Sequence, residues 1–139
     1  MIESTLAELA RDIATKAHDG QFRRDGLTPY ITHCESVAKR AGAGEDAIAV
    51  AWLHDVIEDT DVSAGDLKEA GIPVEVIDAV ERLTKRSEIP YEKYLESVAE
   101  SALATKVKIA DMLTNLSDQP TKSQIRKYAK GLLFLTEDD

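Results

Sequence analysis

The sequence predicts an all-α fold, a single bundle of about seven to eight helices formed by residues 1–139. The length of 139 residues suits one compact domain. Apolar residues recur at the spacing of one helical face along most of the chain. No stretch alternates polar and apolar residues as a half-buried strand does.

The first helix is expected near the N-terminus. Thr5 and Glu8 have the spacing of a capping box, in which each side chain bonds the backbone of the other residue. An apolar stripe follows at helical spacing, made of Leu6, Leu9, Ala10, Ile13, Ala14 and Ala17. Glycines and a proline interrupt this period over residues 18–29, which are therefore expected to form a loop.

The next two helices are expected to include the centre of the core. The second helix should carry His33 and end near Gly42 and Gly44, because glycine commonly ends a helix. Residues 45–58 then include the almost uniformly apolar string AIAVAWLHDVI. A helix that is apolar on all sides is a buried one, so this segment is predicted to be the central helix.

Helix-start signals mark three further helices. Ser63 and Asp66 form the cap of a short helix that should end at Gly71. Pro73 suits the first turn of the following helix, and Pro90 suits the first turn of another.

Two helices are expected in the last third of the chain. Residues 103–116 should form the first, with Val107, Ala110 and Leu113 facing inward. Residues 123–135 should form the second.

Composition excludes several classes of protein. A formal charge of −9 repels nucleic-acid phosphate, so no nucleic-acid partner is expected. The 43% apolar share is ordinary for a folded chain, and no apolar run is long enough to cross a membrane. The N-terminus lacks a signal-peptide core, and the single cysteine, Cys34, excludes an intrachain disulfide. We therefore expect a cytoplasmic protein with no membrane partner.

Histidines and carboxylates within apolar segments are the candidate functional residues. His54 and Asp55 lie side by side in the most apolar segment, and Asp111 lies within VKIADMLTNL. Buried ionisable groups are costly unless they are paired or bind a metal. Together with His33, these residues offer two imidazoles and two carboxylates, which suit a divalent ion such as manganese, iron or zinc. Taken alone, the segment at residues 54–59 is equally well read as the polar end of a core helix.

The order His…His-Asp…Asp resembles the HD-domain metal-dependent phosphohydrolases. The chain is most similar to the hydrolase domain of the RelA/SpoT alarmone enzymes and to small alarmone hydrolases. Three strings carry the resemblance: AHDGQFRRDGLTPYITH at residues 17–33, AWLHDVIEDT at residues 51–60 and VKIADMLTNL at residues 107–116. With their connecting helices, these strings cover nearly the whole chain. The Glu-Asp pair that follows His-Asp is typical of this subgroup.

The resemblance implies a manganese-dependent enzyme that hydrolyses the 3′-pyrophosphate of a (p)ppGpp-like alarmone. The products would be GDP or GTP and pyrophosphate. The metal ligands it implies are His33, His54, Asp55 and Asp111. It also implies that Glu58 and Asp59 orient and deprotonate the attacking water. The chain is too short to include the synthetase domain of the long alarmone enzymes as well.

The resemblance further implies a nucleotide-binding shell. Arg23 matches the arginine that stacks on the purine in relatives, and Arg24 competes for this role because the loop is about one residue longer here. Lys108 resembles a lysine near the phosphates, and Asn115 resembles an asparagine that contacts the nucleotide. Each of the four side chains is also compatible with a simple surface position.

The chain departs from the long alarmone enzymes after Asp111. Met112, Thr114 and Ser117 replace an arginine, a histidine and a second arginine, which puts the guanine preference in doubt. An adenosine alarmone such as (p)ppApp, the 2′-phosphate of NADPH or another 3′-phosphorylated nucleotide therefore stays open as the substrate.

Two readings from other classes also stay open. One is an HD 5′-nucleotidase, which would release inorganic phosphate. The other is a non-catalytic nucleotide-binding or antitoxin-like module. The expected partner in every reading is a small nucleotide, and a homo-oligomeric state is left open.

Overall fold

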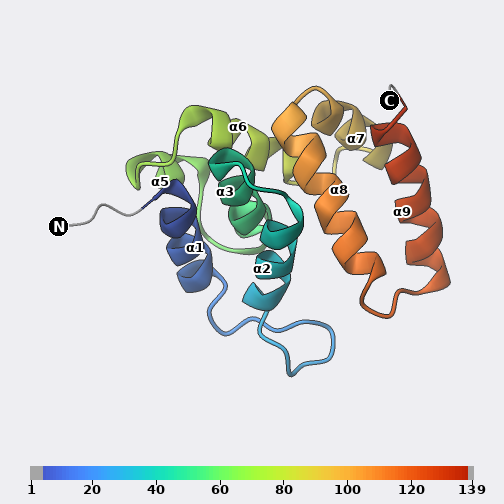
Figure 1. The fold of residues 1–139 in the computed structure, drawn as a ribbon, viewed down its shortest axis with the longest axis horizontal. Coiled ribbons are helices and arrows are strands. Elements are labelled where there is room, and N and C mark those ends of the chain that lie inside the picture. Colours follow the sequence, from blue (N-terminus) through green and yellow to red (C-terminus); the bar gives the residue numbers. More distant parts are fainter. Residues whose placement is uncertain (1–4, 138–139) are drawn as a thin grey trace.

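The computed structural model describes residues 5–137, and this part of the chain consists of helices joined by loops (Figure 1). Its only strand-like pairing is one isolated bridge between Phe22 and Pro29. The described residues form nine helices: α1 (Leu6–Ala17), α2 (Ile31–Arg40), α3 (Glu45–Leu53), α4 (Val56–Asp59), α5 (Ala64–Glu69), α6 (Val74–Leu83), α7 (Tyr91–Ala99), α8 (Ala102–Leu116) and α9 (Lys122–Leu135). The all-α prediction is confirmed. Residues 1–4 and 138–139 of the predicted domain lie outside the described residues.

Local sequence signals mark the start of several helices. Thr5 accepts a hydrogen bond from the backbone N–H of Glu8, whose side chain bonds the Thr5 backbone in return. Ser63 forms the same reciprocal box with Asp66 at the start of α5. Both predicted caps are confirmed, and each satisfies backbone groups that the first helical turn leaves free.

The central helix is α3, which packs against α1, α2, α6 and α8. Figure 1 shows it between the N-terminal helices and α8. Residues 49–51 and Leu53 are fully buried, so α3 is apolar on nearly every side, as predicted. This placement puts the C-terminal end of α3 in the interior of the bundle.

The segment predicted as one helix over residues 45–58 is divided in two. Helix α3 ends at Leu53, and α4 begins at Val56 after a turn formed by His54 and Asp55. Asp55 leaves the helical region with φ −106° and ψ 1°. Its carboxylate accepts a hydrogen bond from the Tyr30 hydroxyl, a contact between distant segments that local propensity does not encode. This break raises the helix number among the described residues above the predicted seven to eight.

Helix α8 faces the core differently from our prediction. Val107 and Ala110 are buried, whereas Leu113 is 46% exposed. Asp111 and Met112 take up the inward positions instead. The prediction for Leu113 was wrong because the helix is rotated to turn the Asp111 carboxylate toward the interior.

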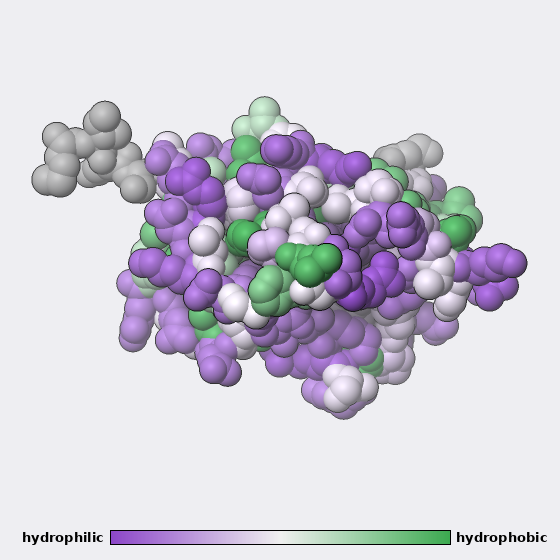
Figure 2. All heavy atoms as spheres, turned by 90° about the horizontal axis from the view of Figure 1, so that it is seen from below, coloured by the Kyte–Doolittle hydropathy of each residue, from purple (hydrophilic) through white to green (hydrophobic). Residues whose placement is uncertain are grey.

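Among residues 5–137, no helix combines the length and the apolar character needed to cross a bilayer. The face drawn in Figure 2 is mostly hydrophilic, and its hydrophobic groups occur in small separate areas.

Candidate metal centre and pocket

Three side chains from three parts of the fold meet inside the bundle. His33 comes from α2, His54 from the α3–α4 turn and Asp111 from α8. His33 Nε2 lies 2.9 Å from Asp111 Oδ1, and His54 Nε2 lies 3.4 Å from the same oxygen. All three residues are at least nine-tenths buried. The structure therefore brings together ligand-type atoms that are far apart in the sequence.

Asp55 extends this group toward a second carboxylate cluster. Its Oδ2 atom lies 3.0 Å from His54 Nε2. Ligand atoms of Asp55, Glu58 and Asp59 all lie within 4.8 Å of one another, as do those of His33, His54 and Asp111. Asp55 thus links the two clusters.

The orientation of His54 fits a metal ligand. Its Nδ1 atom lies 2.7 Å from the carbonyl oxygen of Ala51, which can only accept, so Nδ1 carries a proton and Nε2 is the nitrogen that could coordinate a metal. Nε2 is buried and, in the described part of the chain, forms no hydrogen bond of good geometry, although carboxylate oxygens of Asp55 and Asp111 lie 3.0 and 3.4 Å from it. An orphaned imidazole nitrogen that faces two carboxylates is the arrangement expected where a divalent cation binds. The donor set of His33, His54, Asp55 and Asp111 fits such an ion.

The electrostatics of the centre favour a bound cation. Burial opposes the charged form of His54, but the carboxylates of Asp55 and Asp111 outweigh it and raise the His54 pKa well above its usual range. Burial alone would raise the Asp111 pKa, yet Lys108 and the two histidines hold it well below the ordinary value. The pKa of Asp55 is lowered to about 2, chiefly by His54 acting against burial. Both carboxylates are therefore ionised at neutral pH and attract positive charge.

Glu58 and Asp59 stand beside the centre on α4. Partial burial and the neighbouring Asp55 charge raise the pKa of each carboxylate. The backbone of Asp59 is fixed because its carbonyl oxygen accepts a hydrogen bond from Gln21 Nε2 at 2.9 Å. A carboxylate with a raised pKa is suited to accept a proton.

A cavity of about 810 Å³ opens over these groups. Its lining combines the ligand-type residues with Glu58, Asp59 and four cationic residues: Arg23, Lys85, Lys108 and Lys127. The size suits a nucleotide, since small-molecule pockets commonly range over about 300–1,000 Å³. The cationic residues and carboxylates of this lining together fit a ligand that carries phosphate and binds beside a metal.

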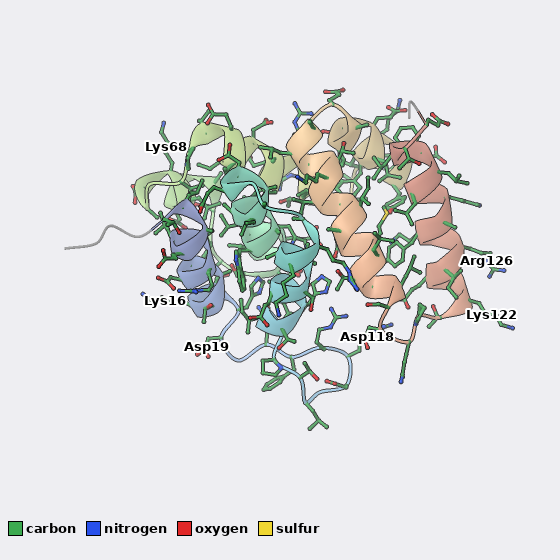
Figure 3. The ribbon with its side chains drawn as sticks, in the orientation of Figure 1. Lys16, Asp19, Lys68, Asp118, Lys122 and Arg126 are labelled. Atoms are coloured by element: carbon green, nitrogen blue, oxygen red, sulfur yellow. The ribbon has the colours of Figure 1, made fainter. Side chains whose placement is uncertain are left out.

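Arg23 lies inside the cavity and is held there before any ligand binds. Its guanidinium donates to Asp118 at 3.3 Å and lies 3.5 Å from Asn115 Oδ1. Asp118 follows the C-terminal end of α8, on the side of the bundle that faces the loop over residues 18–30 (Figure 3). Arg24 is exposed and lines a neighbouring surface depression instead. The structure thus places Arg23, and not Arg24, in the main cavity.

Lys108 and Asn115 both contact the Asp111 carboxylate. Lys108 Nζ lies 3.1 Å from Asp111 Oδ2, and Asn115 Nδ2 donates to Asp111 Oδ1 at 3.3 Å. The pKa of Lys108 is raised because the Asp111 charge outweighs burial. Lys108 is therefore a fixed cation of the pocket wall rather than a freely solvated surface lysine.

Asp25 organises the loop that presents Arg23. Its carboxylate accepts hydrogen bonds from the backbone N–H groups of Leu27 and Thr28, both at 2.8 Å, and from the Thr28 hydroxyl at 2.6 Å. These bonds, led by that of the Thr28 hydroxyl, lower the Asp25 pKa from 3.8 to about 2.

A lowered pKa gives this loop a defined pH dependence. The stabilisation by Asp25 is complete above pH 3.8 and is lost as pH falls through about 2. In an NMR titration from about pH 5 to pH 1, the Leu27 and Thr28 amide signals should shift with a midpoint near 2. At neutral pH, Asp25→Asn should speed exchange of both amides, and Asp19→Asn should not. A midpoint near 3.8 would contradict this assignment.

Several lining residues were not predicted from the sequence. Lys127 and Tyr128 of α9 line the cavity, with the Lys127 ammonium 4.6 Å from the centre of the Tyr91 ring. Lys122 and Arg126 of the same helix point away from the molecule (Figure 3). No local signal separates Lys127 from these neighbours, because only the packing of α9 against α7 and α8 selects it.

Comparison with known proteins identifies the kind of domain. A family model described as HD domain matches residues 10–131. Over 113 residues the chain is 39% identical to a guanosine-3′,5′-bis(diphosphate) 3′-pyrophosphohydrolase of Haemophilus influenzae, covering 77% of this chain and 16% of that protein. It is 32% identical over 112 residues to the enzyme of that name, MESH1, of Drosophila melanogaster, covering 73% and 62% of the two chains. The chain thus spans only a small part of the bacterial relative.

A solved structure supports the same assignment. It is described as a metazoan ortholog of SpoT that hydrolyzes ppGpp and plays a role in starvation responses. It matches with a TM-score of 0.77 and 26% identity, covering 97% of this chain and 87% of that one. Because the family model spans most of the chain and the helices superpose on this relative, the chain belongs to the HD-domain family.

Proposed function

We propose that the chain is a metal-dependent phosphohydrolase that removes the 3′-pyrophosphate of a (p)ppGpp-like alarmone. The products would be GDP or GTP and pyrophosphate. The observation that carries this proposal is the convergence of His33, His54, Asp55 and Asp111 in the lining of a cavity that also includes Arg23, Lys85, Lys108 and Lys127. The names of the relatives support this substrate class.

The four converging side chains would hold the metal, and we propose Mn²⁺. A mixed set of imidazole and carboxylate donors suits a borderline divalent ion, and the carboxylates favour the harder members of that group. When bound, the ion supplies Lewis-acid activation of the attacking water and of the phosphoryl group. The orphaned Nε2 atom of His54 supports this assignment on structural grounds.

The residues of the chain would divide the remaining work. Glu58 and Asp59 would orient the attacking water and accept its proton, since both carboxylates lie beside Asp55 and have raised pKa values. Lys108 would neutralise phosphate charge, and Arg23 would stack on the base. Asn115 would contact the nucleotide between them, because it also lines the cavity.

Product analysis tests this proposal against the other enzyme reading. Purified protein supplied with Mn²⁺ should release pyrophosphate from a guanosine alarmone and should release no inorganic phosphate from a 5′-monophosphate. Inorganic phosphate as the main product would favour the 5′-nucleotidase. A protein that binds no metal when supplied with Mn²⁺ would overturn the proposal.

The base preference is a separate question, and the structure bears on it. Met112, Thr114 and Ser117 replace polar family residues, but none of the three lines the main cavity. Met112 is fully buried, and the Thr114 hydroxyl donates to the carbonyl oxygen of Ala110. Parallel turnover assays on ppGpp, ppApp and NADPH therefore measure whether these three substitutions change the preference for guanine. Equal turnover of all three would contradict a guanine-specific enzyme.

Location and assembly complete the proposal. A nucleotide substrate supports action in the cytoplasm, and the charge of −9 supports a small anionic ligand bound by local cations rather than a nucleic acid. The homo-oligomeric state stays a prediction to be measured by light scattering.

A further inference from the structure

The connection between α6 and α7, residues 84–90, forms one wall of the cavity. Lys85, Ser87, Ile89 and Pro90 line it. The backbone N–H of Lys85 donates to Glu58 Oε1 at 2.6 Å. This bond opposes the effect of burial on the pKa of Glu58. A connection distant in sequence thus holds the carboxylate that lies beside the candidate metal centre.

The Lys85 side chain is turned back on its own segment. Its ammonium donates to the carbonyl oxygen of Arg86 at 2.6 Å and also to that of Ile89. The Ile89 N–H donates to the same Arg86 carbonyl at 3.1 Å. Within residues 5–137, no carboxylate lies at ion-pair distance from this ammonium. The ammonium therefore closes a turn instead of forming a salt bridge.

The two ends of the connection are fixed independently of Lys85. Thr84 is buried, and its hydroxyl donates to the carbonyl oxygen of Val80 at 2.9 Å. The Tyr94 hydroxyl, from α7, donates to the carbonyl oxygen of Leu83 at 2.9 Å. Only the middle of the connection depends on the Lys85 ammonium, so loss of this cation should loosen the turn without releasing the helices.

We propose that Lys85 is a positioning residue for Glu58. Its ammonium stabilises the turn over residues 85–89. This turn fixes the position of the Lys85 backbone N–H, which orients the Glu58 carboxylate. The inference rests on the proposed function, in which Glu58 acts on the attacking water. The orientation of Glu58 matters because displacing a catalytic group by about 1 Å can lower the rate by about a hundredfold.

The first test compares Lys85→Met with Arg86→Met. Both changes remove one positive charge from the connection, but the Arg86 side chain is exposed and lines a different depression. Lys85→Met should lower kcat by about ten- to a hundredfold with KM changed less than about twofold. Arg86→Met should leave both constants within about twofold. A raised KM with unchanged kcat would overturn the proposal, because the ammonium would then contact the substrate directly.

A double-mutant cycle separates positioning from a general loss of structure. In a Glu58→Gln background, Lys85→Met should lower kcat by less than about twofold further, because the two residues act through one contact. Independent, multiplicative losses would overturn the proposal. Thermal unfolding of each variant, followed by circular dichroism, checks that the fold persists.

Amide exchange tests the contact without turnover and without changing Lys85. In Glu58→Ala, the Lys85 amide loses its acceptor and should exchange faster, whereas the Ile89 amide keeps its bond to Arg86 and should remain protected. Unchanged Lys85 exchange would overturn the proposal. If wild-type protein hydrolyses no nucleotide, the proposed function fails. If it does so and Lys85→Met matches Arg86→Met, only the present inference fails.

Discussion

Replacing Glu58 by Gln together with Asp59 by Asn should lower turnover by about 10²–10⁴-fold, the usual contribution of general acid–base catalysis. Both amides keep the shape of the side chains but cannot accept the proton from water. The metal ligands and Lys108 are untouched, so binding of Mn²⁺ and of nucleotide should survive. Stopped assays of pyrophosphate release, with calorimetric titration of metal and nucleotide, measure the two properties separately.

The same double variant decides between catalysis and binding as the biological role. If the variant loses turnover but keeps its full effect in the cell, the chain acts as a nucleotide-binding or antitoxin-like module. If turnover is unchanged, the two carboxylates are not the proton acceptors. Lys93→Gln is a suitable control, because Lys93 is exposed on α7 and pairs with Glu96 on the same helix.

The second large effect is expected from Asp111→Asn. Four groups contact this carboxylate: His33, His54, Lys108 and Asn115. The neutral amide leaves the buried Lys108 ammonium without a carboxylate, and breaking a buried pair in this way costs about 3–5 kcal/mol. Metal affinity should fall by more than about 100-fold, the upper effect of losing a residue that only orients a ligand. Urea unfolding and Mn²⁺ titration check the two effects.

Asp118→Asn is the matched control for this prediction. Asp118 follows the same helix, but its side chain is 62% exposed, so its carboxylate remains largely solvated while it pairs with Arg23. A pair with one largely solvated partner is worth about 0–1 kcal/mol, so stability and metal affinity should change little. Equal losses of stability and of metal affinity in the two variants would show that Asp111 is not a metal ligand.

The local parts of the fold could be predicted from the sequence because short-range contacts determine them. The capping boxes at Thr5 and Ser63 need only residues three positions away. The segment before Leu53 is apolar on all sides, which predicts a buried central helix, and most of its residues are buried. The His and Asp residues of the centre were singled out because ionisable groups stand out in apolar surroundings, and the family resemblance implied the full ligand set.

Other features depend on contacts between segments that are distant in the chain. The turn at His54 and Asp55 places its carboxylate against Tyr30, and the exposure of Leu113 follows from the orientation of Asp111. The bond from Lys85 to Glu58 uses a backbone N–H, which every residue except proline carries. No residue type marks such a donor, so only the three-dimensional structure identifies it.

The pairing of Arg23 with Asp118 has a consequence for affinity. A free arginine side chain carries about 2 kcal/mol of rotamer entropy that a ligand would otherwise have to overcome. Here folding has already restricted the side chain, which is only 15% exposed, through a bridge to a largely solvated carboxylate. Such a bridge is weak and easily exchanged for a ligand contact. Under the proposed function, a nucleotide would therefore meet an arginine that needs little reordering.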